Sequence, residues 1–358
     1  MNRGLGNKPC ARRGLDFGRK GVTVEPMTKI VILGAGSIGC WIGGHLIEGG
    51  AETSLIGRKR YAKQIAELGL TLTHFERQVV RCEAVDFNTD ASALRGADII
   101  ALCVKSQDTE HAAQQIKTYA PQSRVVSFQN GIRNPEILRR VLPSENIIPA
   151  IVPFNVTPAQ PGVFHCGTAG ELAIESHPAI APLVSALQQS GQGVRLSEQI
   201  LGDQWAKMIV NLNNGINTLS GGSLRDGLFQ RDYRRALGRC VEEALHVAKA
   251  NGVEVGHFNG REPKALLKIL RLPNIAYRLV MQTIVKIDAK ARSSMLDDLE
   301  AGRAPEIDYL QGEIVKRAEQ AGLRAPFNAA IRTAVEQAFA KGQSPGLSGT
   351  EILSLMEK

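Results

Sequence analysis

The chain has 358 residues, of which 43% are hydrophobic and 22% are charged, so it can bury a large core and is neither disordered nor of low complexity. At about 100–200 residues per domain, we expect two domains. The formal net charge of +8 points to an anionic partner, for which a nucleotide, a nucleic acid, an acidic metabolite and a lipid surface are the candidates.

Half of the excess charge lies in residues 1–26, which hold six basic and two acidic residues and no periodic apolar pattern. The segment lacks the apolar core of a secretory signal, and its two acids and its lack of serine argue against an organelle transit peptide. We therefore expect a disordered basic leader whose removal at Met27 leaves activity unchanged. The rest of the chain has no legible nucleic-acid-binding module and no apolar run that could span a bilayer, so we expect neither nucleic acid nor a membrane as a partner.

Cysteine and histidine spacings give no sign of disulfides or metal ligands. There is no CxxC pair, no HExxH motif and no Cys/His cluster with the spacing of a metal site, so we expect no structural or catalytic metal. Scattered cysteines in a chain of this size favour reduced thiols and a cytoplasmic setting. They are Cys10, Cys40, Cys82, Cys103, Cys166 and Cys240.

The first ordered elements read as strand, glycine turn and helix. A β-branched run at residues 29–33 is followed by GAGSIG at 34–39, and residues 40–48 have helical spacing. A second strand completes a βαβ unit. The second strand is 52–56. Later strands are predicted as a hairpin at 70–73 and 79–84, and as single strands at 97–104, 124–128 and 147–151. This alternation predicts an α/β fold for residues 27–196, a Rossmann-type, doubly wound, mostly parallel sheet with helices on both faces.

From about residue 197 the apolar pattern becomes helical throughout, which predicts an all-helical second domain over residues 197–342. Residues 343–358 are expected to form a C-terminal tail. The apolar faces of the long helices can pack within the chain or against a second copy, so a homodimer stays open. The predicted helices are 205–219, 233–251, 263–272, 275–300, 306–321 and 328–340.

The glycine turn is the strongest motif, because a strand precedes it and a helix follows it. Gly34 allows the tight turn, Gly36 lets the backbone approach a pyrophosphate, and Gly39 permits close helix–sheet packing. The start of the helix, at Ser37 and Ile38, offers oriented N–H groups to the anion. The alternative is a turn with a purely structural role, and the strand before the turn and the helix after it disfavour this alternative.

Arg58 follows the second strand, where NAD-binding versions of the fold carry an acid that holds the ribose 2′-hydroxyl. An arginine there suits a 2′-phosphate, so we expect NADP(H) rather than NAD(H), unless Arg58 is an ordinary surface residue. Lys105 and Asn130 follow two later strands. Ligands of open α/β sheets bind beyond the carboxyl ends of strands, so the two are candidate site residues rather than a solvated lysine and a turn asparagine.

Polar residues interrupt the apolar pattern of the helical domain. Lys207 and Asn211 are four residues apart and share one helix face, and an Asn-rich stretch follows at 213–217. Asn and Gly are poor helix-interior residues, so the cluster suits either chemistry or an interhelical polar network. Pro305 suits the first turn of a helix and would place Glu306 beside a helix N-terminus, where many acids have only an electrostatic role.

Together these segments resemble the ketopantoate reductase (2-dehydropantoate 2-reductase) family over residues 29–340. The resemblance implies a Rossmann domain joined to a helical domain, with the substrate in the cleft between them. It also implies NADPH-dependent reduction of ketopantoate to pantoate, a step of pantothenate biosynthesis. The segments that carry it are GAGSIG, Arg58, VKSQ around Lys105, QNG around Asn130, WAKMIVN around Lys207, and SSM with GRAPEID, which contains Glu306.

The resemblance also implies residue roles. Lys207 is the general acid, which suits a partly desolvated ammonium, and Glu306 binds the substrate hydroxyl and also contacts the cofactor. Asn211 and Ser294 hold substrate, and Lys105 and Asn130 lie where cofactor and substrate meet, so that Asn130 serves both.

Three positions depart from the family pattern. Gly215 stands where a second Asn is common, which leaves Asn213, Asn214 or Asn217 as its replacement, and we assign Asn217 to the substrate. Ala291 stands in place of Asn, and Pro305 in place of Thr.

Two other functions therefore stay open: a related NADPH-dependent reductase of another 2-oxo acid, and a non-catalytic NADP sensor. A β-hydroxyacid dehydrogenase is disfavoured, because its usual Asn-x-x-x-Lys pattern is reversed between Lys207 and Asn211.

Overall fold

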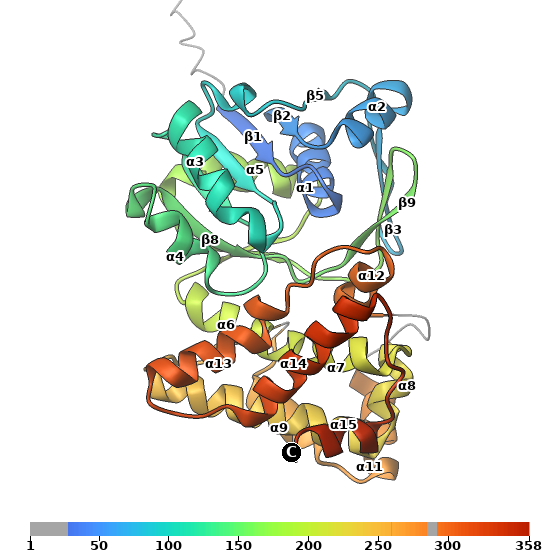
Figure 1. Cartoon of the computed structure of the whole chain (residues 1–358). Coiled ribbons are helices and arrows are strands. Elements are labelled where there is room, and N and C mark those ends of the chain that lie inside the picture. The colour runs from blue at the N-terminus through green and yellow to red at the C-terminus, as the bar shows by residue number, and fades with distance from the viewer. Residues whose placement is uncertain (1–27, 259, 285–291, 358) are drawn as a thin grey trace, which may run out of the picture.

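The computed structural model describes residues 28–258, 260–284 and 292–357. The leader predicted for residues 1–26 and the substituted position Ala291 lie outside these ranges. Figure 1 shows two lobes, an upper lobe of strands and helices and a lower lobe of helices. Among the described residues, we find no helix that combines the length and the apolar character needed to cross a bilayer.

The upper lobe is built on an eight-stranded sheet, and its strands pair in parallel except that β11 is antiparallel to β8. The mostly parallel Rossmann-type sheet predicted from the sequence is confirmed. Across the sheet the strands are β12 (Val194–Ser197), β11 (Leu172–Glu175), β8 (Ile147–Ile151), β7 (Arg124–Ser127), β6 (Ile99–Leu102), β1 (Lys29–Leu33), β2 (Glu52–Ile56) and β5 (Asp86–Asn88).

Helices cover both faces of this sheet because side chains of β1 alternate between two hydrophobic clusters. Ile30 and Ile32 lie with side chains of α1 and α5, whereas Val31 and Leu33 lie with side chains of α3 and α4. The helices of this lobe are α1 (Ser37–Glu48), α2 (Lys59–Leu68), α3 (Thr109–Tyr119), α4 (Asn134–Arg139) and α5 (Ala181–Gln189).

A second, four-stranded sheet lies beside the first. The predicted hairpin is confirmed as the antiparallel pair of β3 and β4, but it continues through a parallel pairing of β3 with β10. β9 was not predicted because Pro158 and a row of exposed residues give it no alternating apolar pattern. In sheet order the strands are β4 (Val80–Cys82), β3 (Leu70–His74), β10 (Val163–Cys166) and β9 (Val156–Gln160).

The lower lobe is all helical, as predicted, and has its own hydrophobic core. Its longest helix, α9, packs against helices from several parts of the lobe. The helices are α6 (Ile200–Asn211), α7 (Asn213–Ser220), α8 (Leu224–Phe229), α9 (Arg231–Ala250), α10 (Pro263–Leu270), α11 (Asn274–Ile284), α12 (Ser294–Glu300), α13 (Gln311–Gln320), α14 (Pro326–Lys341) and α15 (Gly349–Leu355).

Two predicted helices are interrupted, and a third begins later than expected. The helix expected over 205–219 breaks between α6 and α7, where the Gln311 side-chain amide donates to the Leu212 carbonyl oxygen at 2.7 Å. The helix expected over 275–300 is not continuous, because Ser293 is extended and its hydroxyl caps a new helix, α12. The helix expected from residue 306 begins only at Gln311, because Leu310 has a non-helical conformation. Glu306 therefore precedes a short 3-10 turn, Ile307–Tyr309, rather than lying in the first turn of a long helix.

The segment set apart as a C-terminal tail also differs from expectation. α15 begins with a capping box of Ser348 and Glu351. Ile352 and Leu353 are buried in the core of the helical lobe, where α15 packs against α9. These residues are therefore part of the second domain.

Ion pairs between residues at α4 and residues of α13 join the two lobes. The fully buried Glu313 carboxylate accepts from Arg133 Nε at 2.5 Å and from Arg317 Nε at 2.7 Å. Arg317 also pairs with Glu136 of the upper lobe. The Arg133 guanidinium lies 5.0 Å from the centre of the Tyr309 ring, so this network also holds Tyr309 in place.

Candidate active site

Three candidate segments meet at one edge of the main sheet. Gly34 follows β1, Lys105 comes shortly after β6, and Asn130 comes shortly after β7. β1 lies between β2 and β6, so the strand order reverses at β1, and ligands of open α/β sheets bind at such a switch point. The topology therefore brings together residues that are far apart in the sequence.

The glycine turn has the shape that a dinucleotide pyrophosphate needs. Gly34 has φ +103°, and an added Cβ there would lie 2.5 Å from the Val104 backbone nitrogen. A Cβ on Gly39 would lie 2.3 Å from the Gly34 carbonyl oxygen, whereas a Cβ on Gly36 would meet nothing within 4 Å. The first turn of α1, which begins at Ser37, has neither a side-chain cap nor an acidic residue, so its N–H groups suit an anion. The turn therefore fits a nicotinamide dinucleotide.

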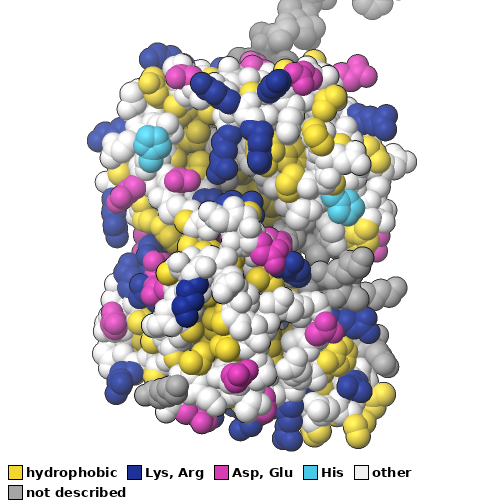
Figure 2. Space-filling model, turned by 45° about the vertical axis from the view of Figure 1, so that its right-hand side comes forward, with side chains coloured by type: hydrophobic (Ala, Val, Ile, Leu, Met, Phe, Trp, Pro, Cys, Tyr) yellow, Lys and Arg dark blue, Asp and Glu magenta, His cyan; other side chains and the backbone are white. Residues whose placement is uncertain are grey.

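Arg58 lies directly before α2 and is exposed beyond the end of β2. Arg60 is directed elsewhere, because it donates to the Tyr61 hydroxyl at 2.8 Å and stacks on that ring. Figure 2 shows Lys and Arg side chains gathered on the upper lobe around a hollow between the lobes. The position of Arg58 suits a group at the adenosine end of a dinucleotide.

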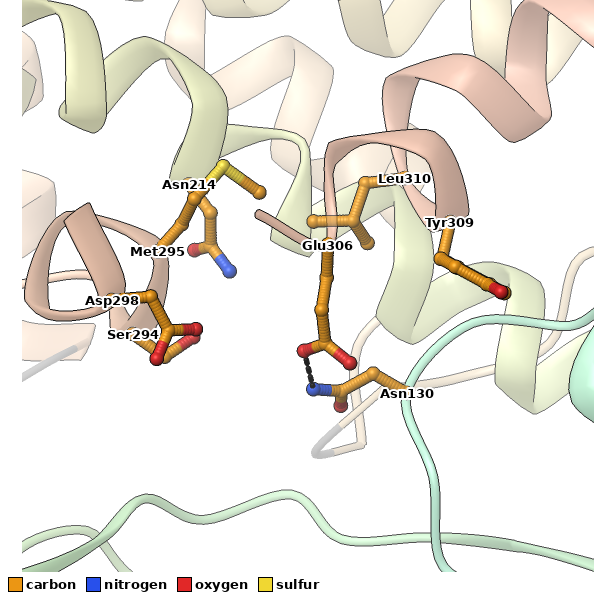
Figure 3. A pocket seen from close by; sticks show the side chains of 8 residues that line it. All are labelled: Asn130, Asn214, Ser294, Met295, Asp298, Glu306, Tyr309 and Leu310. Carbon is orange, nitrogen blue, oxygen red and sulfur yellow. Dashed lines mark hydrogen bonds between the residues drawn. The ribbon is translucent and has the colours of Figure 1, made fainter. Parts of the chain in front are cut away.

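Glu306 is the acceptor at the centre of the interlobe contacts. Its Oε1 accepts from the Ser106 backbone N–H at 3.2 Å and from the Ser106 hydroxyl at 3.0 Å. Its Oε2 lies 3.5 Å from both Lys105 Nζ and Asn130 Nδ2, and Figure 3 shows Asn130 facing Glu306. A carboxylate of the helical lobe is thus bound by three residues of the Rossmann lobe.

Lys207 is a buried ammonium next to this carboxylate. Its Nζ donates to Asn130 Oδ1 at 2.7 Å, and Asn134 holds the Asn130 carbonyl oxygen at 2.6 Å. Burial lowers the pKa of Lys207 to about 8, although the Glu306 carboxylate acts in the opposite direction. Lys207 therefore gives up its proton more readily than an exposed lysine, a property that suits a general acid.

Lys105 has the opposite character. Its Nζ lies 3.0 Å from Asp298 Oδ2 and 3.5 Å from Glu306 Oε2. Burial by itself would lower its pKa, but the two carboxylates outweigh burial and raise it. Lys105 therefore remains a fixed positive charge.

The pocket between the lobes is nearly closed. Its volume is about 10 Å³, which is room for about one water molecule. Figure 3 shows Ser294 and Asp298 at one side and Glu306 with Asn130 at the other. The lining residues are Asn130, Asn214, Ser294, Met295, Asp298, Glu306, Tyr309 and Leu310.

Comparison with known proteins identifies the family. The sequence model described as "Ketopantoate reductase PanE/ApbA" matches residues 30–179, and the model of its C-terminal part matches residues 199–338. The chain belongs to the ketopantoate reductase family. It is 28% identical to the 2-dehydropantoate 2-reductase of Pyrococcus horikoshii over 312 residues, which cover 84% of this chain and 94% of that protein.

Solved structures agree with this family and fold. A PanE/ApbA family ketopantoate reductase from Ralstonia eutropha has a TM-score of 0.76 and 30% identity, over 88% of this chain and 99% of its own. D-mandelate dehydrogenase with NADH and anilino(oxo)acetate has a TM-score of 0.73 at 21% identity, over 88% of this chain and 99% of its own, and shows the fold alone. The cofactor of this member of the family is a nicotinamide dinucleotide.

Most of the site residues expected from the resemblance come together. Lys105, Asn130, Lys207 and Glu306 are connected by hydrogen bonds, and Ser294 lines the same pocket. Asn211, one helical turn beyond Lys207, is half-buried, and like Lys105 and Lys207 it is not among the residues that line the pocket.

Asn217 does not reach the pocket, contrary to expectation. It is fully buried, its Oδ1 accepts from the Ser293 backbone N–H at 3.0 Å, and its Nδ2 donates to the Gly222 carbonyl oxygen at 2.9 Å. Asn217 thus fixes the start of α12, and Asn214 is the asparagine that lines the pocket. At Gly215 an added Cβ would lie 2.8 Å from Gln311 Nε2, so this position faces the helix packing and has no room for an asparagine.

Ser106 and Asp298 were missed as site residues. Ser106 adjoins Lys105, and Asp298 is four residues from Ser294 on the same short helix, so the sequence held a weak signal for each. Met295 and Leu310, which form the apolar wall of the pocket, gave no such signal, because apolar residues in a helical pattern are typical of a hydrophobic core. Within the described ranges, no group of three or more His, Cys, Asp and Glu could hold a metal ion.

Proposed function

We propose that this ketopantoate reductase uses NADPH to reduce ketopantoate (2-dehydropantoate) to pantoate, as a cytoplasmic enzyme of pantothenate biosynthesis. The observation that carries the proposal is the buried Lys207 ammonium, which lies 2.7 Å from Asn130 Oδ1 and whose pKa the Glu306 carboxylate influences. A proton donor with a pKa of about 8 at the carboxyl edge of a nucleotide-binding sheet suits reduction of a carbonyl group.

The residues divide the binding of the two substrates. The glycine turn from Gly34 to Gly39 would hold the pyrophosphate, and Arg58 the 2′-phosphate that distinguishes NADPH. Bound NADPH supplies the hydride. Asn214 and Ser294 offer an amide and a hydroxyl to the bound 2-oxo acid.

The protein's part of the reaction is the transfer of one proton. Lys207 Nζ gives a proton to the C2 carbonyl oxygen as the C2 carbon accepts a hydride, so the ketone becomes a secondary alcohol and Lys207 becomes neutral. Asn130 orients the ammonium through its 2.7 Å hydrogen bond. Glu306 accepts a hydrogen bond from the substrate hydroxyl, and Lys207 takes up a proton from water before the next turnover.

This role of Lys207 predicts the pH dependence. A general acid must be protonated, and its protonated fraction falls as pH rises through its pKa of about 8. We expect kcat/KM for ketopantoate to be level below about pH 7.5 and to fall about tenfold per pH unit well above pH 8. A profile that stays level to about pH 10 would remove Lys207 as the acid.

Arg58 predicts the choice of cofactor. We expect Arg58→Ala to raise KM for NADPH about 10- to 100-fold, because a charge-assisted contact with the 2′-phosphate is lost, and to leave KM for NADH nearly unchanged. Arg60→Ala is the matched control, because Arg60 is bound to Tyr61. Equal use of NADH and NADPH by the wild type would show this assignment of Arg58 to be wrong.

A substrate panel tests the proposed function. We expect NADPH oxidation to be fastest with ketopantoate when it is compared with pyruvate, 2-oxoisovalerate and acetolactate. Faster turnover of another compound would indicate a reductase of a different 2-oxo acid. Tight NADPH binding without oxidation in the presence of any of them would indicate the NADP sensor.

A further inference from the structure

Asp298 is a buried carboxylate whose ion-pair partners come from both lobes. The carboxylate is 4% exposed, and a buried carboxylate needs cationic partners. Asp298 has two: Lys105 Nζ of the Rossmann lobe at 3.0 Å, and Arg303 Nε of its own lobe at 2.5 Å. Asp298 also lines the pocket. The nearer of the two carboxylates around Lys105 is thus Asp298 rather than Glu306.

The two lysines that are connected through Asn130 and Glu306 differ in their counter-charges. Lys105 pairs with both Asp298 and Glu306. Lys207 makes no ion pair within the described residues, and its hydrogen-bond partner is the neutral Asn130. One lysine is therefore stabilised as a cation, and the other is left free to lose its proton. Environments that separate two titratable groups in this way assign them separate tasks.

We propose that Asp298 is a positioning residue that holds the Lys105 ammonium at the rim of the pocket, so that Glu306 stays shared with Ser106 and Asn130 and continues to face Lys207. The proposal rests on the proposed function, because it assigns Lys207 and Glu306 their parts in the reduction. It concerns the arrangement of charges, which is measurable without substrate.

Loss of the Asp298 charge has two consequences. Lys105 keeps one carboxylate of two, so its free amine becomes more abundant at a given pH. Lys105 then pairs more closely with Glu306 and draws that carboxylate away from Asn130 and Lys207. Glu306 raises the pKa of Lys207. If Glu306 moves away, the pKa of Lys207 falls and Lys207 loses its proton at a lower pH.

The test compares Asp298→Asn with Asp297→Asn. Asn has nearly the size of Asp, so the substitution removes the charge and one acceptor oxygen with little change in volume. Asp297 is the neighbouring acid of the same helix, does not line the pocket, and has Arg292 as its ion-pair partner at 3.9 Å, so it serves as the matched control. The Lys105 side chain is 38% exposed and open to an amine-reactive reagent, whose attachment is located by mass spectrometry.

We expect Lys105 to be labelled at least about threefold faster in Asp298→Asn than in the wild type, since the free amine rises about tenfold for each pKa unit lost. The alkaline limb of kcat/KM should move to lower pH, and Asp298→Glu should restore both properties. A merely structural role would lower activity equally at all pH values. Thermal unfolding of each variant shows whether the fold is retained.

Unchanged labelling of Lys105 in Asp298→Asn, or an equal increase in Asp297→Asn, would overturn the proposal. A faster labelling together with no turnover of ketopantoate by the wild type would instead refute the proposed function and leave the role of Asp298 standing. The two failures are therefore distinguishable, because labelling needs neither NADPH nor substrate.

Discussion

We expect Lys207→Ala to reduce kcat with NADPH and ketopantoate about 10²- to 10⁴-fold, which corresponds to about 2.7–5.5 kcal/mol of transition-state stabilisation. The variant removes the proton donor while the glycine turn and the Glu306 contacts with the Rossmann lobe remain. NADPH affinity should therefore change little. Steady-state oxidation of NADPH, followed at saturating substrate, measures the loss.

The fold should tolerate the loss of this lysine. An ammonium without an ion pair in a buried site opposes folding, as its lowered pKa shows. We expect Lys207→Met, which keeps the stem but not the charge, to unfold at the same temperature as the wild type or higher. Slow turnover with unreduced stability separates chemistry from folding. Undiminished turnover of Lys207→Ala would exclude Lys207 as the acid.

Gly36 lies in the glycine turn that would hold the pyrophosphate of NADPH. We expect Gly36→Val to weaken NADPH binding at least about 30-fold, equivalent to about 2 kcal/mol, because its side chain would enter the space that the pyrophosphate needs. An added Cβ meets nothing within 4 Å at this position, so the unfolding temperature should stay close to that of the wild type. Fluorescence titration with NADPH and thermal unfolding measure the two properties.

Gly39→Ala is the matched comparison. Its Cβ would lie 2.3 Å from the Gly34 carbonyl oxygen, so the backbone must shift and stability should fall by about 1–3 kcal/mol. One glycine is thus needed for the cofactor and the other for the fold. Unchanged NADPH affinity in a folded Gly36→Val protein would show that the pyrophosphate does not bind at this turn.

The Rossmann half of the site is predictable because its information is local. The strand Lys29–Leu33, the glycine turn and the helix after it lie within one short segment, and each position has a separate physical requirement. Lys105 and Asn130 could also be placed at this edge from the sequence, because parallel strands end at one edge wherever they lie in the chain.

The helical half is less predictable because long-range contacts decide which residues face the pocket. At the helix break, the Leu212 carbonyl oxygen accepts a hydrogen bond from Gln311, which lies 99 residues away in the sequence. That break leaves Asn214 at the pocket and Asn217 at the start of α12, and helical periodicity could not distinguish the two. The pairing of β3 with β10 was missed for a similar reason, because no local signal joins segments so far apart.

Conversion of ketopantoate tests the proposed reduction most directly. Purified enzyme is mixed with NADPH and ketopantoate at neutral pH, and NADPH oxidation is compared with pantoate formation by mass spectrometry. We expect one pantoate to form for each NADPH oxidised. With Lys207→Ala, we expect almost no NADPH oxidation and almost no pantoate. NADPH oxidation without pantoate, or equal pantoate formation by Lys207→Ala, would contradict reduction of ketopantoate by a proton from Lys207.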